Sequence, residues 1–164
     1  MMSAVKMRSK QMIIGVILII VGIIIDQITK LISFKYLEPG KNYKSFPGFE
    51  FRLIKNEGAA WGIFSNKMWL LIIITFIAFG FFVYLMKDFD LKENPIYSAS
   101  LILIISGTFG NFIDRIFLGY VRDFVSFSFI NFPYFNFADM CLTVGVIFLS
   151  IDILFGQTGV NWTK

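Results

Sequence analysis

The 164-residue chain contains no histidine, a single cysteine and four prolines, and only 16% of its residues are charged. Without histidine, the catalytic systems that pair serine or cysteine with an imidazole base are excluded, as are most zinc and haem sites. Carboxylate or lysine chemistry remains. Because Cys141 has no second cysteine to pair with, it carries no information about redox compartment, and we interpret it as a packing residue.

Hydrophobic residues are abundant instead, at 57% of the chain, and 18% of the residues are aromatic. This excess is too large for an ordinary water-soluble domain, so the composition predicts an integral membrane protein. The formal net charge of +4 is modest and forms no basic stripe of the kind that binds nucleic-acid phosphates. We therefore expect membrane lipids as partners, and no nucleic acid.

Four apolar runs are each about long enough to cross a hydrocarbon core of ~30 Å. The predicted fold is an all-α integral membrane protein, a single domain over residues 1–164 with four transmembrane helices, at approximately residues 12–34, 68–86, 96–118 and 140–155. Basic residues precede the first run, as in a signal peptide. However, the run is too long for a signal peptide and no small-residue cleavage site follows, so we expect it to remain as a helix.

Charge leaves the orientation open. The dense cluster Lys6, Arg8 and Lys10 beside the first helix favours a cytoplasmic N-terminus, whereas the total count of lysines and arginines slightly favours the opposite. In either orientation, residues 35–67 and 119–139 emerge on the same side.

Both of these segments alternate with strand period. In Phe49-Glu50-Phe51-Arg52-Leu53 the apolar residues would form one face of a small β element on the first loop, with Glu50 and Arg52 facing water. The second segment alternates similarly over residues 124–129, before Pro133 ends the run. Together the two segments could hold a substrate strand at the membrane surface.

Two aspartates, Asp123 and Asp139, lie on either side of the gap between the third and fourth runs. Charged carboxylates at the edge of hydrocarbon are costly, which favours a functional role. Asp139 also has a structural interpretation, because Asn136 suits the N-cap of the fourth helix and a carboxylate three residues later meets free backbone N–H groups. Asp123 could equally be a solvated loop carboxylate. If the two converge, they can share a proton and activate water.

Two interpretations from other classes remain. The protein could be a transporter or channel subunit in which Asp26, Asp114, Asp123 and Asp139 carry cations or protons, or an assembly factor whose polar residues hold helices together. The clustering of carboxylates toward one membrane face, in helices without a break at mid-depth, favours the enzyme over the transporter.

Five short blocks resemble the lipoprotein signal peptidases, also called signal peptidase II, and follow one another in that family's order. They are Asp26-Gln-Ile-Thr-Lys30, Asn56-Glu-Gly-Ala-Ala-Trp-Gly62, Gly110-Asn-Phe-Ile-Asp-Arg115, Val121-Arg-Asp-Phe124 and Phe135-Asn-Phe-Ala-Asp139. Each block alone is weak, but their order, spacing and four-helix setting make the resemblance specific.

The resemblance implies an aspartic endopeptidase of the bacterial inner membrane. Such an enzyme removes the signal peptide from diacylglyceryl-modified prolipoproteins by cleaving before the lipidated cysteine, and the residues matching Asp123 and Asp139 are its catalytic pair. It also implies cytoplasmic termini, an active site near the outer face, no metal or organic cofactor, and inhibition by the cyclic peptide antibiotic globomycin. We expect a monomer.

Supporting residues follow from the same blocks. Asn111 and Asn136 resemble polar residues that line the family's site, while Asn56 and Gly58 resemble a loop that closes over the substrate. Gly58 has the alternative interpretation of a tight turn before the second helix.

Charged residues in the blocks also have expected partners. Asp26 and Lys30, spaced i and i+4, are expected to pair along the first helix in a structural role. Asp114 and Arg115 are adjacent and cannot pair ideally on a helix, so Arg115 is expected to reach substrate carbonyls or lipid headgroups; alternatively, it is a snorkelling residue at a helix end.

Two positions depart from the family pattern, and one further residue has no assigned role. Arg122 precedes Asp123 where the family more often has an apolar residue, but in a strand the two side chains would point to opposite faces. Ser106-Gly107 replaces a common glycine pair, which a close helix contact should tolerate. Asp152 lies deep in the fourth run without an assigned role.

Overall fold

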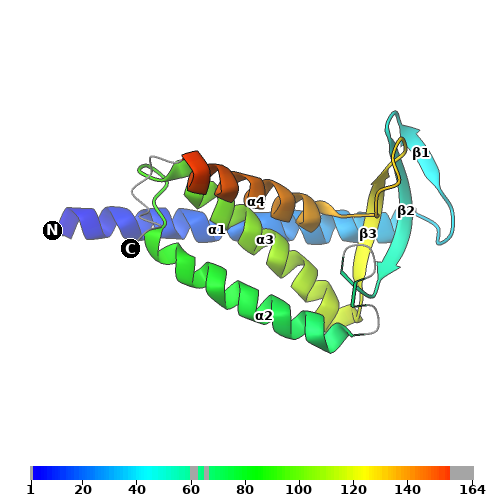
Figure 1. The fold of residues 1–164 in the computed structure, drawn as a ribbon, viewed down its shortest axis with the longest axis horizontal. Coiled ribbons are helices and arrows are strands. Elements are labelled where there is room, and N and C mark those ends of the chain that lie inside the picture. The colour runs from blue at the N-terminus through cyan, green and yellow to red at the C-terminus, as the bar shows by residue number, and fades with distance from the viewer. Residues whose placement is uncertain (1, 60–62, 65–66, 156–164) are drawn as a thin grey trace.

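The computed structural model describes residues 2–59, 63–64 and 67–155. Four helices run along the molecule, and a small sheet covers one end of the bundle, opposite the end where the N-terminus lies (Figure 1). The helices are α1 (Met2–Tyr36), α2 (Met68–Leu85), α3 (Pro95–Leu118) and α4 (Phe137–Phe155), with a short 3-10 helix, η2 (Met86–Asp88), after α2. All four are long and apolar enough to cross a membrane, which confirms the predicted fold class.

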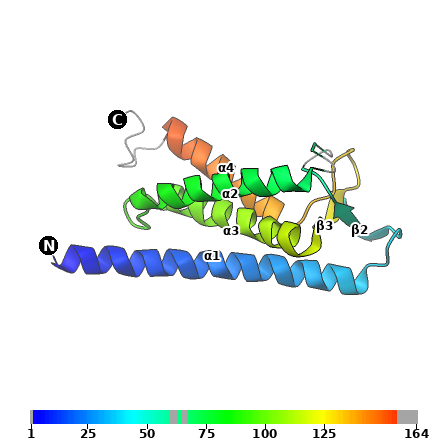
Figure 2. The same ribbon diagram turned by 90° about the horizontal axis from the view of Figure 1, so that it is seen from below.

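Two helices begin three or more residues earlier than expected. α1 starts near the N-terminus rather than at residue 12, and at 35 residues it is ~52 Å long, well beyond the ~30 Å hydrocarbon core. Figure 2 shows α1 as one straight helix beside the shorter α2 and α3. α4 starts at Phe137, three residues before the predicted boundary, because the chain ahead of it is capped by side chains described below.

α3 is the central helix and packs against α1, α2 and α4. Pro95 occupies its first turn, where the missing N–H costs no hydrogen bond, and Gly119 ends it with a positive φ of 75° that turns the chain toward the sheet. Small residues allow close approach, as expected for helices in a membrane. At Gly110 a Cβ atom would lie 2.5 Å from Asp26 Oδ2 on α1. Glycine at this position therefore allows α1 and α3 to approach each other closely.

The sheet has three antiparallel strands in the order β1 (Tyr43–Phe46), β2 (Phe49–Asn56) and β3 (Val121–Phe127). The β element predicted on the first loop is therefore present, and a strand from the second loop completes it. In the pairing of β2 with β3, Phe49 lies opposite Phe127 and Asn56 opposite Val121. This pairing brings the blocks around residues 56 and 123 together.

The alternation predicted for β2 is only partly observed. Its register with β3 shifts between Phe51 and Ile54, so the strand does not keep one regular apolar face. Glu50 and Arg52, expected in water, are half-buried, and Glu50 accepts a hydrogen bond from the Tyr134 hydroxyl at 2.9 Å. Tyr134 lies 84 residues further along the chain, so local sequence does not reveal this contact.

The two ends of the helical bundle have different interiors. Near the turn between α2 and α3 the core is apolar, built around Leu85, Phe89, Tyr97 and Leu101. At the sheet end the interior is polar, and its buried side chains include Asp26, Lys30, Asn111, Asp114, Arg122, Asp123 and Asn136. The residues singled out in the five blocks thus lie at this sheet end, while Asp152 is buried elsewhere, in the last two turns of α4.

Candidate active site

The start of α4 positions Asp139. The backbone N–H of Asp139 donates to Asn136 Oδ1 at 3.0 Å, and the backbone N–H of Asn136 donates in return to Asp139 Oδ2 at 3.1 Å. This is a reciprocal capping box in which aspartate replaces the usual glutamate. The helix-cap interpretation of both residues is confirmed, and it fixes the Asp139 carboxylate at the mouth of the helix.

Asp123 is held from two sides by amide groups. Asn136 Nδ2 donates to Asp123 Oδ1 at 2.7 Å, and Asn56 Nδ2 donates to Asp123 Oδ2 at 2.8 Å. Asn56 is itself fixed, because its Oδ1 accepts the backbone N–H of Gly58 at 2.9 Å. This hydrogen bond agrees with the alternative interpretation of Gly58 as part of a tight turn, and it orients the Asn56 side chain toward the carboxylate.

Asn111, on α3, connects the two aspartates to the charged residues behind them. Its Nδ2 donates to Asp139 Oδ1 at 2.7 Å, while its Oδ1 accepts from Asn136 Nδ2 and from Lys30 Nζ, both at 3.0 Å. Since a lysine ammonium only donates, Lys30 dictates which end of the Asn111 amide faces Asp139. The three asparagines and Lys30 thus form one hydrogen-bonded frame around both carboxylates.

The surroundings of Asp123 favour its protonated form. Burial raises the pKa of its carboxyl group and the nearby charge of Asp139 raises it further, to about 7, although the hydrogen bonds from Asn56 and Asn136 act in the opposite direction. Asp123 is only 2% exposed. A carboxyl group with this pKa can hold a proton near neutral pH while a neighbouring carboxylate remains ionised.

A second cluster of charges lies behind the frame, at the junction of α1, α3 and β3. Lys30 Nζ is 2.8 Å from Asp26 Oδ2, which confirms the predicted pair, and 3.6 Å from Asp114 Oδ2. Arg122 binds Asp114 through Nη2 at 2.7 Å and through Nε at 3.1 Å, and its Nη2 also donates to Gln27 Oε1 at 2.8 Å. Two cations and two anions thus balance in a buried site.

Arg122 and Gln27 are members of this cluster that the sequence did not single out as site residues. The expectation that Arg122 points away from the face of Asp123 agrees with its contacts to Asp114 and Gln27. A signal was present, since Gln27 belongs to the first block and Arg122 to the fourth. Each contact joins two different elements, β3 with α3 through Asp114 and β3 with α1 through Gln27, so spacing within one element could not identify it.

Asp26 also contributes to the frame. Its Oδ1 accepts the backbone N–H of Ala138 at 2.9 Å, so a carboxylate of α1 caps the N-terminus of α4, where the helix dipole favours negative charge. The pair of Asp26 with Lys30 therefore fixes α4, and with it Asp139, relative to α1.

Arg115 is not part of the charged cluster that contains its neighbour Asp114. It lies beside a cavity of about 530 Å³ that is also lined by Asn56, Asn111, Asp123 and Asp139. Its buried Nε has no hydrogen-bond acceptor within the described part of the chain. The cavity wall continues over apolar and aromatic residues: Val121, Phe127, Phe132, Phe135, Met140, Leu142 and Val144. A polar end with two carboxylates and one arginine thus joins an apolar channel.

Such a cavity suits hydrolysis of a polar bond in an otherwise apolar ligand. One carboxylate can accept a proton from water while the other donates one, and the arginine adds a cation for developing negative charge. Over residues 2–59, 63–64 and 67–155, no group of three or more histidine, cysteine, aspartate or glutamate side chains is placed to hold a metal ion.

Comparison with known proteins identifies the group to which this arrangement belongs. A family model described as signal peptidase (SPase) II matches residues 18–155. The chain belongs to the signal peptidase II family. It therefore has the fold of a bacterial multi-pass membrane peptidase, as the order of the five blocks predicted.

Individual relatives agree with this assignment. The lipoprotein signal peptidase of Lactiplantibacillus plantarum is 42% identical over 142 residues, which cover 86% of this chain and 94% of the relative. That of Clostridium tetani is 43% identical over 146 residues, covering 85% and 91%. A solved bacterial membrane enzyme that is 33% identical superposes with a TM-score of 0.79 over 92% of this chain and 93% of its own.

Proposed function

We propose that this protein is an aspartic endopeptidase that removes the signal peptide from diacylglyceryl-modified prolipoproteins, cleaving before the lipidated cysteine. Asp123 and Asp139 are the catalytic residues. The observation that carries the proposal is the frame in which Asn136 and Asn111 hydrogen-bond both carboxylates at the polar end of an apolar cavity. The family of the chain and the names of its relatives support the same reaction.

The reaction uses one proton shared by the two aspartates. In the starting state Asp123 is protonated and Asp139 is ionised. Asp139 takes a proton from a water molecule while the water oxygen bonds to the carbonyl carbon of the residue before the cysteine. Asp123 donates its proton to the carbonyl oxygen, which gives a neutral tetrahedral intermediate. When the C–N bond breaks, the two aspartates donate one proton to the leaving amine. One hydroxyl group of the intermediate returns a proton to the aspartates, which leaves the carboxylic acid product. The raised pKa of Asp123 supports this assignment of the first proton.

The remaining polar residues support this chemistry. Arg115, which lines the cavity and whose Nε has no acceptor among the described residues, donates to a carbonyl oxygen of the substrate through its guanidinium. Asn56, Asn111 and Asn136 orient the carboxylates, and the Gly58 turn fixes Asn56. The ion pairs and helix cap made by Asp26, Lys30 and Asp114 hold α1, α3 and α4 in place relative to one another. These three are positioning residues rather than catalytic ones.

Lipid recognition follows from the same cavity. The substrate's acyl chains can remain among apolar side chains while the peptide lies extended beside the sheet. Each buried CH₂ group contributes ~0.8 kcal/mol, so lipidated precursors should be strongly preferred over unlipidated ones. We further propose that the protein acts as a monomeric single domain with cytoplasmic termini and its active site near the outer face, needs no metal or cofactor, and is inhibited by globomycin.

The proposal is tested by cleavage of a purified diacylglyceryl-prolipoprotein with the detergent-solubilised protein and with the variants Asp123→Asn and Asp139→Asn. Each variant should lose essentially all cleavage, because an amide can neither accept the proton from water nor hold the shared one. Asp88→Asn, at the far end of the bundle, is the matched control and should keep full activity.

Folding of the variants is checked by their thermal unfolding in the same detergent. Full cleavage by either dyad variant would refute the aspartic mechanism. Equal turnover of the unlipidated precursor would refute the proposed recognition of the lipid.

A further inference from the structure

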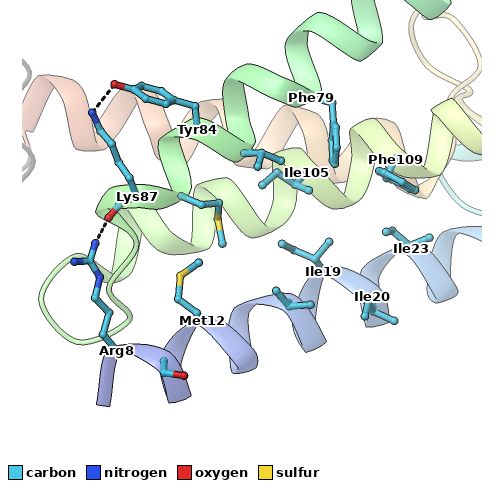
Figure 3. Close-up of a pocket in the computed structure, with 14 residues that line it drawn as sticks. Arg8, Met12, Ile19, Ile20, Ile23, Phe79, Tyr84, Lys87, Ile105 and Phe109 are labelled. Atoms are coloured by element: carbon cyan, nitrogen blue, oxygen red, sulfur yellow. Dashed lines mark hydrogen bonds between the residues drawn. The ribbon is translucent and has the colours of Figure 1, made fainter. Parts of the chain in front are cut away.

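A second cavity lies at the opposite end of the molecule from the two aspartates. It has a volume of about 910 Å³ and is formed between α1, α2 and α3. Figure 3 shows Ile19, Ile20 and Ile23 of α1 on one side, with Phe79 and Phe109 on the other. None of these residues takes part in the site described above. We call this cavity the α1–α2 groove.

Polar and charged groups gather at one end of the α1–α2 groove. Arg8 and Lys87 lie there, and the Arg8 guanidinium donates to the Lys87 carbonyl oxygen (Figure 3). Lys87 Nζ donates to the Tyr84 hydroxyl at 2.9 Å. A guanidinium has five N–H donors and an ammonium three, so these bonds use only part of their capacity. Asp88 and Asp90, whose carboxylates attract the two cations, do not line the groove.

The dimensions of the α1–α2 groove correspond to one leaflet of a bilayer. Its lining on α1 extends from Arg8 to Ile23, a helix length of ~22 Å. One leaflet of the hydrocarbon core is about 15 Å thick, so an acyl chain whose headgroup lies at Arg8 reaches the midplane within the groove. The groove thus has cations at the level of the headgroups and apolar side chains along the rest of its length. A membrane lipid requires this arrangement.

The charge of the polar end selects among possible occupants. An anionic phosphate can accept hydrogen bonds from both Arg8 and Lys87. The signal peptide of a precursor would be a poor occupant, because its positively charged N-terminal region would lie against these two cations. We propose that the α1–α2 groove binds an anionic glycerophospholipid, with its headgroup at Arg8 and Lys87 and an acyl chain along Ile20 and Phe79. This site is separate from the proposed peptidase site and does not depend on it.

The charge at the groove is tested by counting lipids retained on the intact detergent-solubilised protein by native mass spectrometry. The probes are dioleoyl phosphatidylglycerol and dioleoyl phosphatidylcholine. The unmodified protein should bind phosphatidylglycerol more tightly, and Arg8→Gln/Lys87→Gln should weaken that binding by about 30-fold, as two charges at a membrane surface do. Lys10→Gln/Lys92→Gln removes two exposed cations that do not line the groove, and should retain the preference.

The location is tested by filling the groove. Ile20→Trp places a large ring in the lining and should reduce lipid binding, whereas Ile17→Trp, exposed on the same helix but outside the lining, should not. Both positions face lipid, so both variants are expected to fold. Their unfolding temperatures provide the check.

Four results would overturn the proposal. They are equal binding of both lipids by the unmodified protein, equal loss of binding in the Lys10/Lys92 control, unchanged binding in Ile20→Trp, and a dimer that only Ile20→Trp abolishes. The last would assign the groove to a second copy of the chain. Because the readout is bound lipid, a failure of the proposed peptidase reaction would leave the test intact.

Discussion

Asn136 combines two roles that the sequence presented as alternatives. Its Oδ1 caps α4 through the N–H of Asp139, and its Nδ2 donates to Asp123. The backbone N–H of the same residue donates to the Asp139 carboxylate, so one asparagine starts the helix and contacts both carboxylates. The cap interpretation and the site interpretation do not compete, since the acceptor and donor ends of the side chain serve different partners.

The pKa of Asp123 predicts a pH dependence at the residue scale. Because burial and Asp139 raise this pKa to about 7, kcat/KM should fall above that pH as the pair loses its shared proton. Asn56→Ala removes a donor that stabilises the ionised form, so the pKa should rise and the alkaline limb should move to higher pH by about one unit.

The measurement is the pH profile of precursor cleavage for both proteins. Glu57→Ala, an exposed neighbour in the same loop, should leave the profile in place. An alkaline limb that stays fixed in Asn56→Ala, or moves to lower pH, would contradict the assignment to Asp123.

At the scale of elements, the contacts that orient the site are made between different helices and strands. Arg122 attaches β3 to α3 through Asp114 and to α1 through Gln27. Asp26 attaches α1 to α4 through the N–H of Ala138. With Asn56 at the end of β2, the catalytic frame therefore depends on three helices and two strands, and no single element forms it alone.

Breaking the pair of Arg122 with Asp114 should destabilise the fold. Arg122→Met removes the guanidinium from Asp114, so the buried carboxylate keeps the backbone N–H of residue 122 at 2.9 Å but has Lys30, at 3.6 Å, as its remaining cation. Loss of one member of a buried ion pair typically costs about 3–5 kcal/mol. The cost is measured from the unfolding midpoint in detergent. Lys55→Met, the exposed cross-strand neighbour of Arg122, is the matched control and should change stability little.

A double-mutant cycle with Asp114→Asn isolates the interaction itself. The cost of the double variant should be clearly smaller than the sum of the two single ones. An additive result, or equal unfolding midpoints for Arg122→Met and Lys55→Met, would show that this contact does not hold β3 in place.

At the scale of the whole molecule, the two ends of the helical bundle differ in chemistry. The sheet end holds buried charges and the aspartates, while the opposite end holds the apolar core and the α1–α2 groove. This polarity predicts that the ends face different sides of the membrane, with the sheet outside.

Thiol labelling tests the orientation. In a Cys141→Ala background, Lys41→Cys near the sheet should react with a membrane-impermeant reagent on intact cells, whereas Lys10→Cys should react only after permeabilisation. Both positions are exposed, so a difference reflects the side of the membrane. The reverse pattern would place the active site in the cytoplasm.

Much of the fold could be predicted from local sequence patterns. Four helices, the capping of α4 by Asn136, the pair of Asp26 with Lys30 and strands on both loops all follow from patterns within a few residues, where periodicity and neighbouring side chains decide conformation. The order of the five blocks likewise identified the family before any contact was known. Helix boundaries were less accurate: α1 continues to Met2, because polar residues can extend a helix beyond the apolar run.

The sequence by itself determined the class of the protein, its membrane spans, its family and most residues of the candidate site, with Gln27 and Arg122 as the exceptions. Only the tertiary structure decided how those residues meet: Arg122 with Asp114, Asn56 with Asp123, and Asp26 with the start of α4. The physical reason is that spacing governs contacts along one helix or strand, whereas contacts between elements depend on their packing. The register shift between Phe51 and Ile54 and the close approach of Asp26 to Gly110 are features of that packing.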